Sequence, residues 1–175
     1  MSSNHTMLTI GAFIILTTTL QNFYQVLGTT GDDISDAQDM ILATTLTTSY
    51  LEIAQGMAFD EVTDTSSVAL GNAWALTPTL SLGHEDAAED TLTRFNDFDD
   101  FNRYSIEREV PGTGRRYRTE FQVWYVDPAN VNTVSAARTF VKRIDTRTWR
   151  TFPPPAGTVR DTLHMSLAMG YFHFD

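Results

Sequence analysis

The spacing of apolar residues divides the chain into a helical N-terminal third and a strand-like C-terminal part. Residues 7–16 (MLTIGAFIIL) are almost all apolar, and apolar residues remain frequent as far as Leu27. Over residues 33–59 they recur at steps of three and four, which predicts a second helix with one buried face. That stripe consists of Ile34, Ala37, Ile41, Ala43, Leu46, Tyr50, Ile53, Ala54 and Met57.

A glycine-flanked segment, Gly28-Thr-Thr-Gly31, lies between the two apolar stretches. Glycine weakens a helix, and Asp32 or Asp33 immediately afterwards can cap the start of a new one. We therefore expect a long N-terminal helix that is broken near Gly28–Gly31.

Residues 104–175 alternate between apolar and polar positions, as half-buried antiparallel strands do. Three turn segments separate the apolar rows: 111–114 (PGTG), 127–130 (DPAN) and 153–157 (PPPAG). The rows are Tyr104, Ile106 and Val110; Tyr117, Phe121, Val123 and Tyr125; Phe140 and Ile144, with Lys142 and Thr146 on the same face; and Leu163, Met165, Leu167, Met169 and Tyr171.

These patterns predict an α+β fold in which a long N-terminal α-helix packs on a C-terminal antiparallel β-sheet of about four strands. The apolar face of the sheet over residues 104–175 needs a partner, and the helix over 33–59 is available. Residues 60–103 are rich in Thr, Ser and Asp and predict loops with one or two short strands, at 67–70 and 72–76. We expect a hydrophobic assembly helix over 1–31 and a globular head over 32–175.

The first thirty-one residues contain no Asp, Glu, Lys or Arg. A cleaved signal peptide would carry a positive charge ahead of its apolar run, and a conventional membrane span would need about twenty apolar residues. No Lys or Arg precedes this apolar run, so it does not fit a signal peptide. Thr17–Thr19 and several amide side chains interrupt it, so it does not fit a conventional membrane span either. A helix buried against other protein fits better, because threonine hydroxyls can bond to backbone carbonyls one turn back. Burial inside the same monomer is the alternative.

The apolar residues of this segment spread around the helix instead of forming one narrow stripe. A helix that is surrounded by neighbouring copies requires such a distribution. The predicted subunit interface is therefore Ile10, Phe13, Ile14, Leu16, Leu20, Phe23, Tyr24 and Leu27.

Charge and composition exclude several classes of partner. The formal net charge is −10, and no Lys or Arg occurs before Arg94. Nucleic acid and anionic lipid headgroups both need a positive surface, so neither is expected to bind. There is no cysteine, which excludes disulfides, thiolate metal sites and cysteine nucleophiles.

The sequence assigns no catalytic, cofactor-binding or metal site. None of the four histidines has metal-ligand spacing, and no nucleophile, phosphate-loop or dinucleotide motif is present. The segment 96–102 (NDFDDFN) raises a calcium hypothesis, with Asp97 and Asp99 as ligands, but it lacks the glycine and distal glutamate of an EF-hand loop. Phe98 and Phe101 are expected to anchor this segment. We expect no enzyme activity.

The order of these elements resembles that of type IV pilins and pseudopilins. The likeness rests on MLTIGAFIILTTTLQNFYQVLG, LATTLTTSYLEIAQGMAFDEVTD, FNDFDDFNRYSIERE, RTFVKRIDTRTW and DTLHMSLAMGYFHF. It is divergent, because no basic leader with a prepilin cleavage site precedes the apolar run, and Thr9 stands where the family usually carries a glutamate.

The resemblance implies a structural subunit of a pilus-like extracellular filament at the cell surface. Such subunits lie in the inner membrane only transiently, before assembly, and then polymerise with other copies of themselves through their N-terminal helices. Exposed Thr and Ser residues of an extracellular head are candidate acceptors of glycans. An envelope-anchored adhesin, or binding module, whose acidic loops recognise a ligand is the alternative function.

Overall fold

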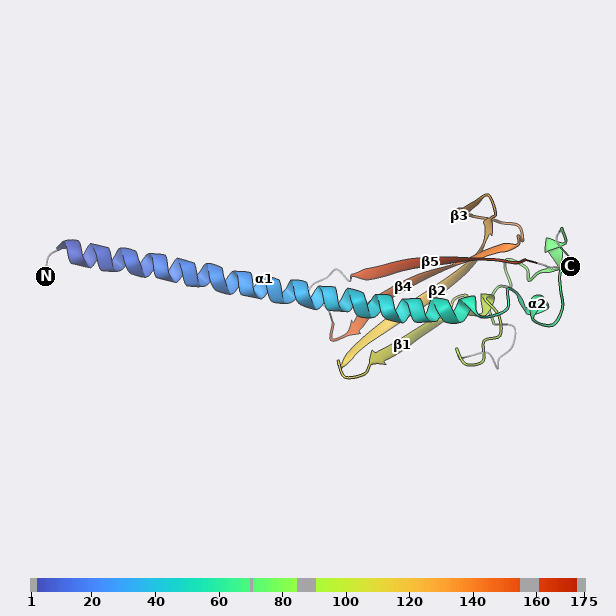
Figure 1. Ribbon diagram of the computed structural model, residues 1–175, viewed down its shortest axis with the longest axis horizontal. Helices are drawn as coiled ribbons and strands as arrows, with labels where there is room; N and C mark the ends of the chain where they lie inside the picture. Colours follow the sequence, from blue (N-terminus) through green and yellow to red (C-terminus); the bar gives the residue numbers. More distant parts are fainter. Residues whose placement is uncertain (1–2, 70, 85–90, 155–160, 173–175) are drawn as a thin grey trace. The chain divides into compact units, whose positions relative to one another are not determined.

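The computed structural model describes residues 3–69, 71–84, 91–154 and 161–172. Its first element is α1, a single helix of 53 residues, Ser3–Gln55 (Figure 1). The expected break near Gly28–Gly31 is wrong, because the helix runs through both glycines without interruption. The second helical stretch ends at Gln55 and not at residue 59, and Gly56 closes it by donating to the carbonyls of Glu52 and Ile53.

Two properties of the segment explain why the helix continues. A glycine costs a helix only about 1 kcal/mol relative to alanine and keeps its N–H donor, whereas proline removes the donor; the first proline of the chain is Pro78. Thr29 between the glycines bonds back through its hydroxyl to the carbonyls of Gln25 and Val26. Asp32 and Asp33 are consequently interior helical residues and cap nothing.

The chain divides into two compact units, Met1–Ile41 and Leu42–Asp175. Residues 32–41, which the sequence assigned to the head, fall in the first unit. The second unit contains the last turns of α1 and the whole sheet.

All strands of the sheet pair antiparallel, in the spatial order β1-β2-β4-β5, and β3 pairs with the end of β2. The expected α+β architecture is confirmed, with a fifth, short strand beyond the four expected. The strands are β1 (Ser105–Val110), β2 (Arg115–Asp127), β3 (Asn130–Val134), β4 (Val141–Phe152) and β5 (Thr162–Gly170).

The expected turns at 111–114 and 127–130 join β1 to β2 and β2 to β3. Gly112 and Gly114 have φ values of 78° and 66°, in the left-handed region that favours glycine. Residues 155–157 of the third expected turn lie outside the described residues.

The alternating rows expected of the sheet are confirmed on its two central strands. On β2, Tyr117, Phe121, Val123 and Tyr125 are buried, while Trp124 is exposed. On β4, Lys142, Ile144 and Thr146 are buried in the same alternation. Met165, Leu167 and Met169 of β5 pack against the core from the edge of the sheet.

The last turns of α1 lie along one face of this sheet (Figure 1). Tyr50 meets Phe121 edge to face with ring centroids 5.6 Å apart, and the Thr47 hydroxyl lies 2.7 Å from that of Thr148. The buried residues of this main core are Tyr50, Leu51, Ala54, Phe95, Phe98, Phe101, Phe121, Val123 and Ile144.

The helical stripe facing the sheet is shorter than expected and slightly rotated. Ala43 is its first buried residue, whereas Ile34 and Ile41 are exposed. Leu51 is buried and Ile53 is exposed, so the stripe follows Thr47, Leu51 and Ala54 on its inner side. Steps of three and four are both compatible with a helix, so the pattern alone does not choose between neighbouring stripes.

In its described residues (60–69, 71–84 and 91–103), the connecting region contains short helices and no named strand. It contains α2 (Glu61–Thr65), η1 (Ala73–Ala75) and η2 (Asp99–Phe101), with one isolated bridge between Ala58 and Asp97. The expected strand at 72–76 is therefore wrong, and residue 70 of the other expected strand lies outside the described residues. A second apolar cluster forms here from Phe59, Val68, Leu76, Leu82 and Tyr125.

Replacing Phe121 by alanine is expected to lower the free energy of unfolding by about 3–5 kcal/mol, because a large ring is lost from a packed core. Phe121 contacts Tyr50, Phe101 and Tyr104 and is 3% exposed. Phe152→Ala, on a side chain that is 48% exposed, is the control and should cost about 1 kcal/mol or less. Urea unfolding followed by tyrosine and tryptophan fluorescence measures both, and equal losses would contradict the assignment of the core.

Candidate assembly helix and a buried charge cluster

The apolar side chains at the start of α1 are exposed. All eight predicted interface residues are between 46% and 68% exposed, and Met7, Leu8, Ile15 and Val26 are exposed as well. The alternative that this segment is buried inside its own monomer is therefore not observed. Gly11, Gly28 and Gly31 are equally open, since a Cβ added at any of them would meet no atom within 4 Å.

The threonines of this segment bond back to the helix, as expected from the sequence. The hydroxyl of Thr17 donates to the carbonyl of Phe13 at 2.7 Å, and Thr19 donates to Ile15 at 2.8 Å. Thr9 and Thr18 make the same kind of bond. A threonine whose hydroxyl is bonded in this way tolerates apolar surroundings better than one with a free hydroxyl.

The segment also has the length and composition of a membrane-crossing helix. Within the described residues, one helix long and apolar enough to cross a bilayer runs through His5–Gln55, and its most apolar window is not buried. Residues 7–27 of a helix rise about 31 Å at 1.5 Å per residue, close to the ~30 Å thickness of the hydrocarbon core. Length and composition alone are weak evidence of a membrane span.

The acidic segment 96–102 is buried and not a surface loop. Phe98 and Phe101 are completely buried, which confirms them as anchors. Asp97 accepts from the backbone N–H groups of Asp99 and Asp100 at 2.8 and 3.1 Å, and Asp100 accepts from Asn96 N at 2.9 Å. These bonds fold the segment into the turn that η2 continues.

The calcium hypothesis gains no support from this arrangement. Among the described residues, no three acidic or histidine side chains are grouped so that they could hold a metal ion. Asp99 instead meets the ammonium group of Lys142. The upstream acidic residues at 85, 86, 89 and 90 lie outside the described part of the chain.

Lys142 is the centre of a fully buried charge cluster. Its side chain is 0% exposed, and its Nζ donates to Asp60 Oδ2 at 2.8 Å, to the Phe59 carbonyl at 2.8 Å and to Asp99 Oδ1. The rings of Phe59 and Tyr125 flank the same nitrogen, with centroids at 4.8 and 5.3 Å. β4 carries Lys142 on the row that faces the core, directly opposite Tyr125 of β2.

Asp60 is the most completely hydrogen-bonded member of the cluster. It is the N-cap of α2 and accepts from Val62 N at 3.3 Å. Thr77 donates to it from its backbone nitrogen, at 3.0 and 3.2 Å, and from its hydroxyl at 3.1 Å, and the Tyr125 hydroxyl lies 3.1 Å away. Five groups from four parts of the chain therefore hold this carboxylate in one position.

The two carboxyl groups respond in opposite directions to this environment. Burial acts to raise the pKa of Asp60, but the Lys142 charge and the hydrogen bonds from Lys142, Thr77 and Val62 outweigh it and hold the pKa below its usual value. For Asp99 burial dominates, and the pKa is raised despite the Lys142 charge, with the Asp60 charge adding to the increase. Burial, followed by the two aspartate charges, also raises the pKa of Tyr125.

Of the three histidines in the head, the structure describes two. His84 packs against the ring of Phe95, with centroids 5.1 Å apart, and His164 is exposed on β5. His173 lies outside the described residues. Neither of the placed histidines joins the charge cluster.

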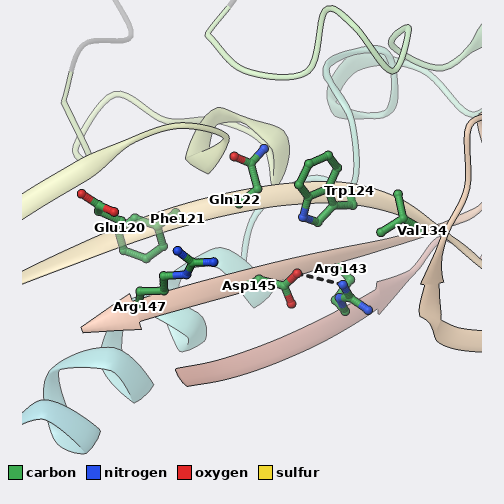
Figure 2. Close-up of a pocket in the computed structure, with 8 residues that line it drawn as sticks. All are labelled: Glu120, Phe121, Gln122, Trp124, Val134, Arg143, Asp145 and Arg147. Carbon is green, nitrogen blue, oxygen red and sulfur yellow. Dashed lines mark hydrogen bonds and ion pairs between the residues drawn. The ribbon is translucent and has the colours of Figure 1, made fainter. Parts of the chain in front are cut away.

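A shallow hollow of about 470 Å³ lies on the sheet face that points away from α1 (Figure 2). Trp124 and Gln122 of β2 line one side, and Arg143, Asp145 and Arg147 of β4 line the other. An ion pair of 2.8 Å joins Arg143 to Asp145. The hollow is open and carries charges of both signs.

Sequence reasoning placed Lys142 on an apolar row but did not identify its partners. The signal that could have drawn attention to it is its rarity: Lys142 is the only lysine among the twelve basic residues. A lone lysine on the inward face of a strand needs a buried acid, because a buried ammonium is costly unless it is paired.

Comparison with protein-family models, with curated proteins and with solved structures found no match for this chain.

Replacing Lys142 by methionine is expected to destabilise the head by about 3–5 kcal/mol, because Asp60 and Asp99 would stay buried without their cation. Arg147→Met removes a basic residue from the exposed side of the same strand and should change stability by less than about 1 kcal/mol. Urea unfolding at neutral pH measures both variants. A Lys142→Met head as stable as the Arg147→Met head would show that the cluster does not stabilise the fold.

Proposed function

We propose that this chain is a structural subunit of an extracellular, pilus-like helical filament, and that it polymerises through residues 7–27 of α1. The observation that carries the proposal is a helical surface that bears no ionic group and whose apolar side chains are exposed. Exposed apolar surface of this extent in a soluble protein marks an interaction site.

The distribution of the apolar residues supports contact with several neighbours at once. At about 100° per residue, Leu8, Ile15 and Val26 lie on roughly the opposite side of the helix from Phe13 and Leu20. A single partner helix covers only one stripe. A bundle of identical helices covers all sides, which is the arrangement that a filament core provides.

The energy available from burial is large enough to drive assembly. Covering a large apolar side chain contributes about 1.5–3 kcal/mol, so eight of them supply on the order of 10–20 kcal/mol before costs are subtracted. Association of two molecules costs an estimated 4–15 kcal/mol. Contacts with more than one neighbour therefore leave a surplus.

The same segment suits a transient stay in the inner membrane before assembly. Its length of about 31 Å matches a bilayer core, and the bonded threonine hydroxyls lower the cost of placing them in lipid. The acidic head, in a chain of net charge −10, would remain in water and away from anionic headgroups. No catalytic residues and no cofactor are assigned.

An envelope-anchored binding module is the second candidate, and the hollow beside Trp124 favours it. Its volume of about 470 Å³ falls within the range of small-molecule sites, about 300–1,000 Å³. In this reading α1 would hold the head at the membrane, and Arg143 and Arg147 would contact an acidic or hydroxyl-rich ligand.

Deleting residues 1–31 separates these two functions. The filament proposal predicts that the full-length protein forms filaments in negative-stain microscopy, whereas the truncated protein is a monomer whose head unfolds at the same urea concentration as before. Light scattering after size exclusion measures the monomer. Full-length protein that stays monodisperse in detergent-free buffer would contradict the filament, and ligand binding retained by the truncated head would favour the binding module.

A matched pair of charge substitutions tests the interface residue by residue. Phe13→Glu and Leu80→Glu each add one negative charge, at side chains that are 65% and 90% exposed. Phe13→Glu is expected to raise the concentration needed for assembly at least about 100-fold, since a buried unpaired carboxylate costs several kcal/mol. Leu80→Glu should leave that concentration within about threefold. Sedimentation of filaments across a dilution series measures it, and equal effects would remove Phe13 from the interface.

A further inference from the structure

The placement of the single lysine is unusual. The chain uses arginine at eleven of its twelve basic positions, and its only lysine, Lys142, is fully buried between two aromatic rings and two carboxyl groups. Arginine cannot lose its proton in a protein, whereas lysine can, and neutral lysine is a nucleophile. The one amine side chain of the chain is therefore placed where water is excluded and a carboxyl group is in contact.

We propose that the folded head joins Lys142 to Asp99 through an intramolecular amide bond, with Asp60 carrying the protons that the reaction releases. The bond would link β4 to η2, across 43 positions of the sequence. It would be a covalent modification made by the protein's own side chains.

The geometry brings together the three groups that the reaction needs. Lys142 Nζ contacts Asp99 Oδ1, and the same nitrogen lies 2.8 Å from Asp60 Oδ2. The Phe59 carbonyl, also at 2.8 Å, fixes the amine from a third side. Proximity of this kind corresponds to effective concentrations of about 10⁵–10⁸ M in well-oriented intramolecular reactions.

Asp99 is held as an acceptor for this attack. It lies in η2 next to Phe98, and Phe98 and Phe101 are both 0% exposed. Its second oxygen, Oδ2, is buried and has no hydrogen-bond partner among the described residues. A carboxylate that served only in an ion pair would gain from a donor on that oxygen. Burial also raises the pKa of Asp99, which favours the neutral acid, the more electrophilic form.

Asp60 is suited to carry protons, because it is held in place and its pKa is lowered, whereas that of Asp99 is raised. Thr77, Val62 and Tyr125 already hold it with hydrogen bonds, and its pKa is lowered. It is therefore ionised, oriented and in contact with the amine. Two carboxyl groups whose environments push their pKa values apart are able to take different roles in one reaction.

The step balances without any further reactant. The Lys142 Nζ–Asp99 Cγ bond forms and one Cγ–O bond of Asp99 breaks. Of the three protons on the ammonium group, one stays on the amide nitrogen and two pass to Asp60. Asp60 gives one of these to the departing oxygen, which already carries the proton of the neutral Asp99 and leaves as water, and it keeps the other. Asp60 ends protonated, so the positive charge of Lys142 and the negative charge of Asp60 are lost together.

Loss of the two charges gives the reaction a driving force. A buried ion pair keeps paying a desolvation cost of several kcal/mol per ion in the folded state, whereas a buried amide is neutral. The site also excludes the water that would hydrolyse the product. An ordinary ion pair and an amide differ in covalent mass, so a single measurement separates them.

The test is peptide mass spectrometry of the full-length protein after denaturation and trypsin digestion. The bond predicts that residues 95–103 (FNDFDDFNR) and 139–143 (TFVKR) appear as one linked species lighter than their sum by one water, about 18 Da. Trypsin cleaves after a free lysine and not after an acylated one. Recovery of residues 139–142, ending in free Lys142, from more than half of the protein would overturn the proposal.

An amine-reactive reagent gives a second reading, because the denatured chain has only one lysine ε-amine to label. The bond predicts that Lys142 stays unlabelled in the unfolded wild-type protein. Labelling of Lys142 in most molecules would overturn the proposal in the same way as the free peptide.

Three variants assign the roles. Asp99→Ala should leave Lys142 free, and a linked species in this variant would overturn the choice of Asp99. Asp60→Asn keeps the shape of the side chain and should lower the linked fraction at least about tenfold; full linkage would remove Asp60 as the proton carrier. Asp145→Ala, on the outer face of the same strand, is the control and should keep the bond.

Discussion

The apolar side chains on residues 7–27 of α1 are exposed, so the rest of the chain has to form its core without them. Water does not tolerate eight large apolar side chains at 46–68% exposure without a partner, and this chain offers no ionic group within the segment to keep it soluble. The head must therefore fold without any help from this segment. It does so because its core begins at Ala43 and is completed by residues of the sheet and of the connecting region.

The parts of the fold that could be predicted are those in which a short period repeats many times. On β2, Tyr117, Phe121, Val123 and Tyr125 alternate with polar residues, and a one-residue shift would expose all four. The helix break expected near Gly28–Gly31 is wrong because glycine only weakens a helix. The cost of two glycines is small in a helix of 53 residues. β3, with five exposed residues, carries no apolar period that a sequence pattern could detect.

The candidate assembly surface was predictable and its partner was not. Absence of charge over thirty-one residues, together with exposed apolar side chains, marks a candidate interaction surface, but a partner on it would be another molecule, whose position one chain does not show. For the charge cluster, the partners lie within the same chain, but the sequence pattern does not identify them. Lys142 stands out as a lone lysine on an apolar row, yet Asp60 and Asp99 are 82 and 43 positions away in the sequence. Only the folded chain shows which of its many acids are brought to Lys142.

In the proposed filament the subunit would be held by its helix, and the position of the charge cluster would then matter. Phe98 and Phe101, on either side of Asp99 and Asp100, belong to the same core as Tyr50 and Ala54 of α1. A load on α1 would reach the head through the backbone that continues at Gly56 and through the contacts of the last helical turns with the sheet, which include the Thr47–Thr148 hydrogen bond. Lys142 fixes η2 to β4 and so keeps the aromatic residues in place against the helix. Packing resists such a load only while η2 stays in place against the helix, so in the proposed filament the link at Lys142 would hold the segment on which that packing depends.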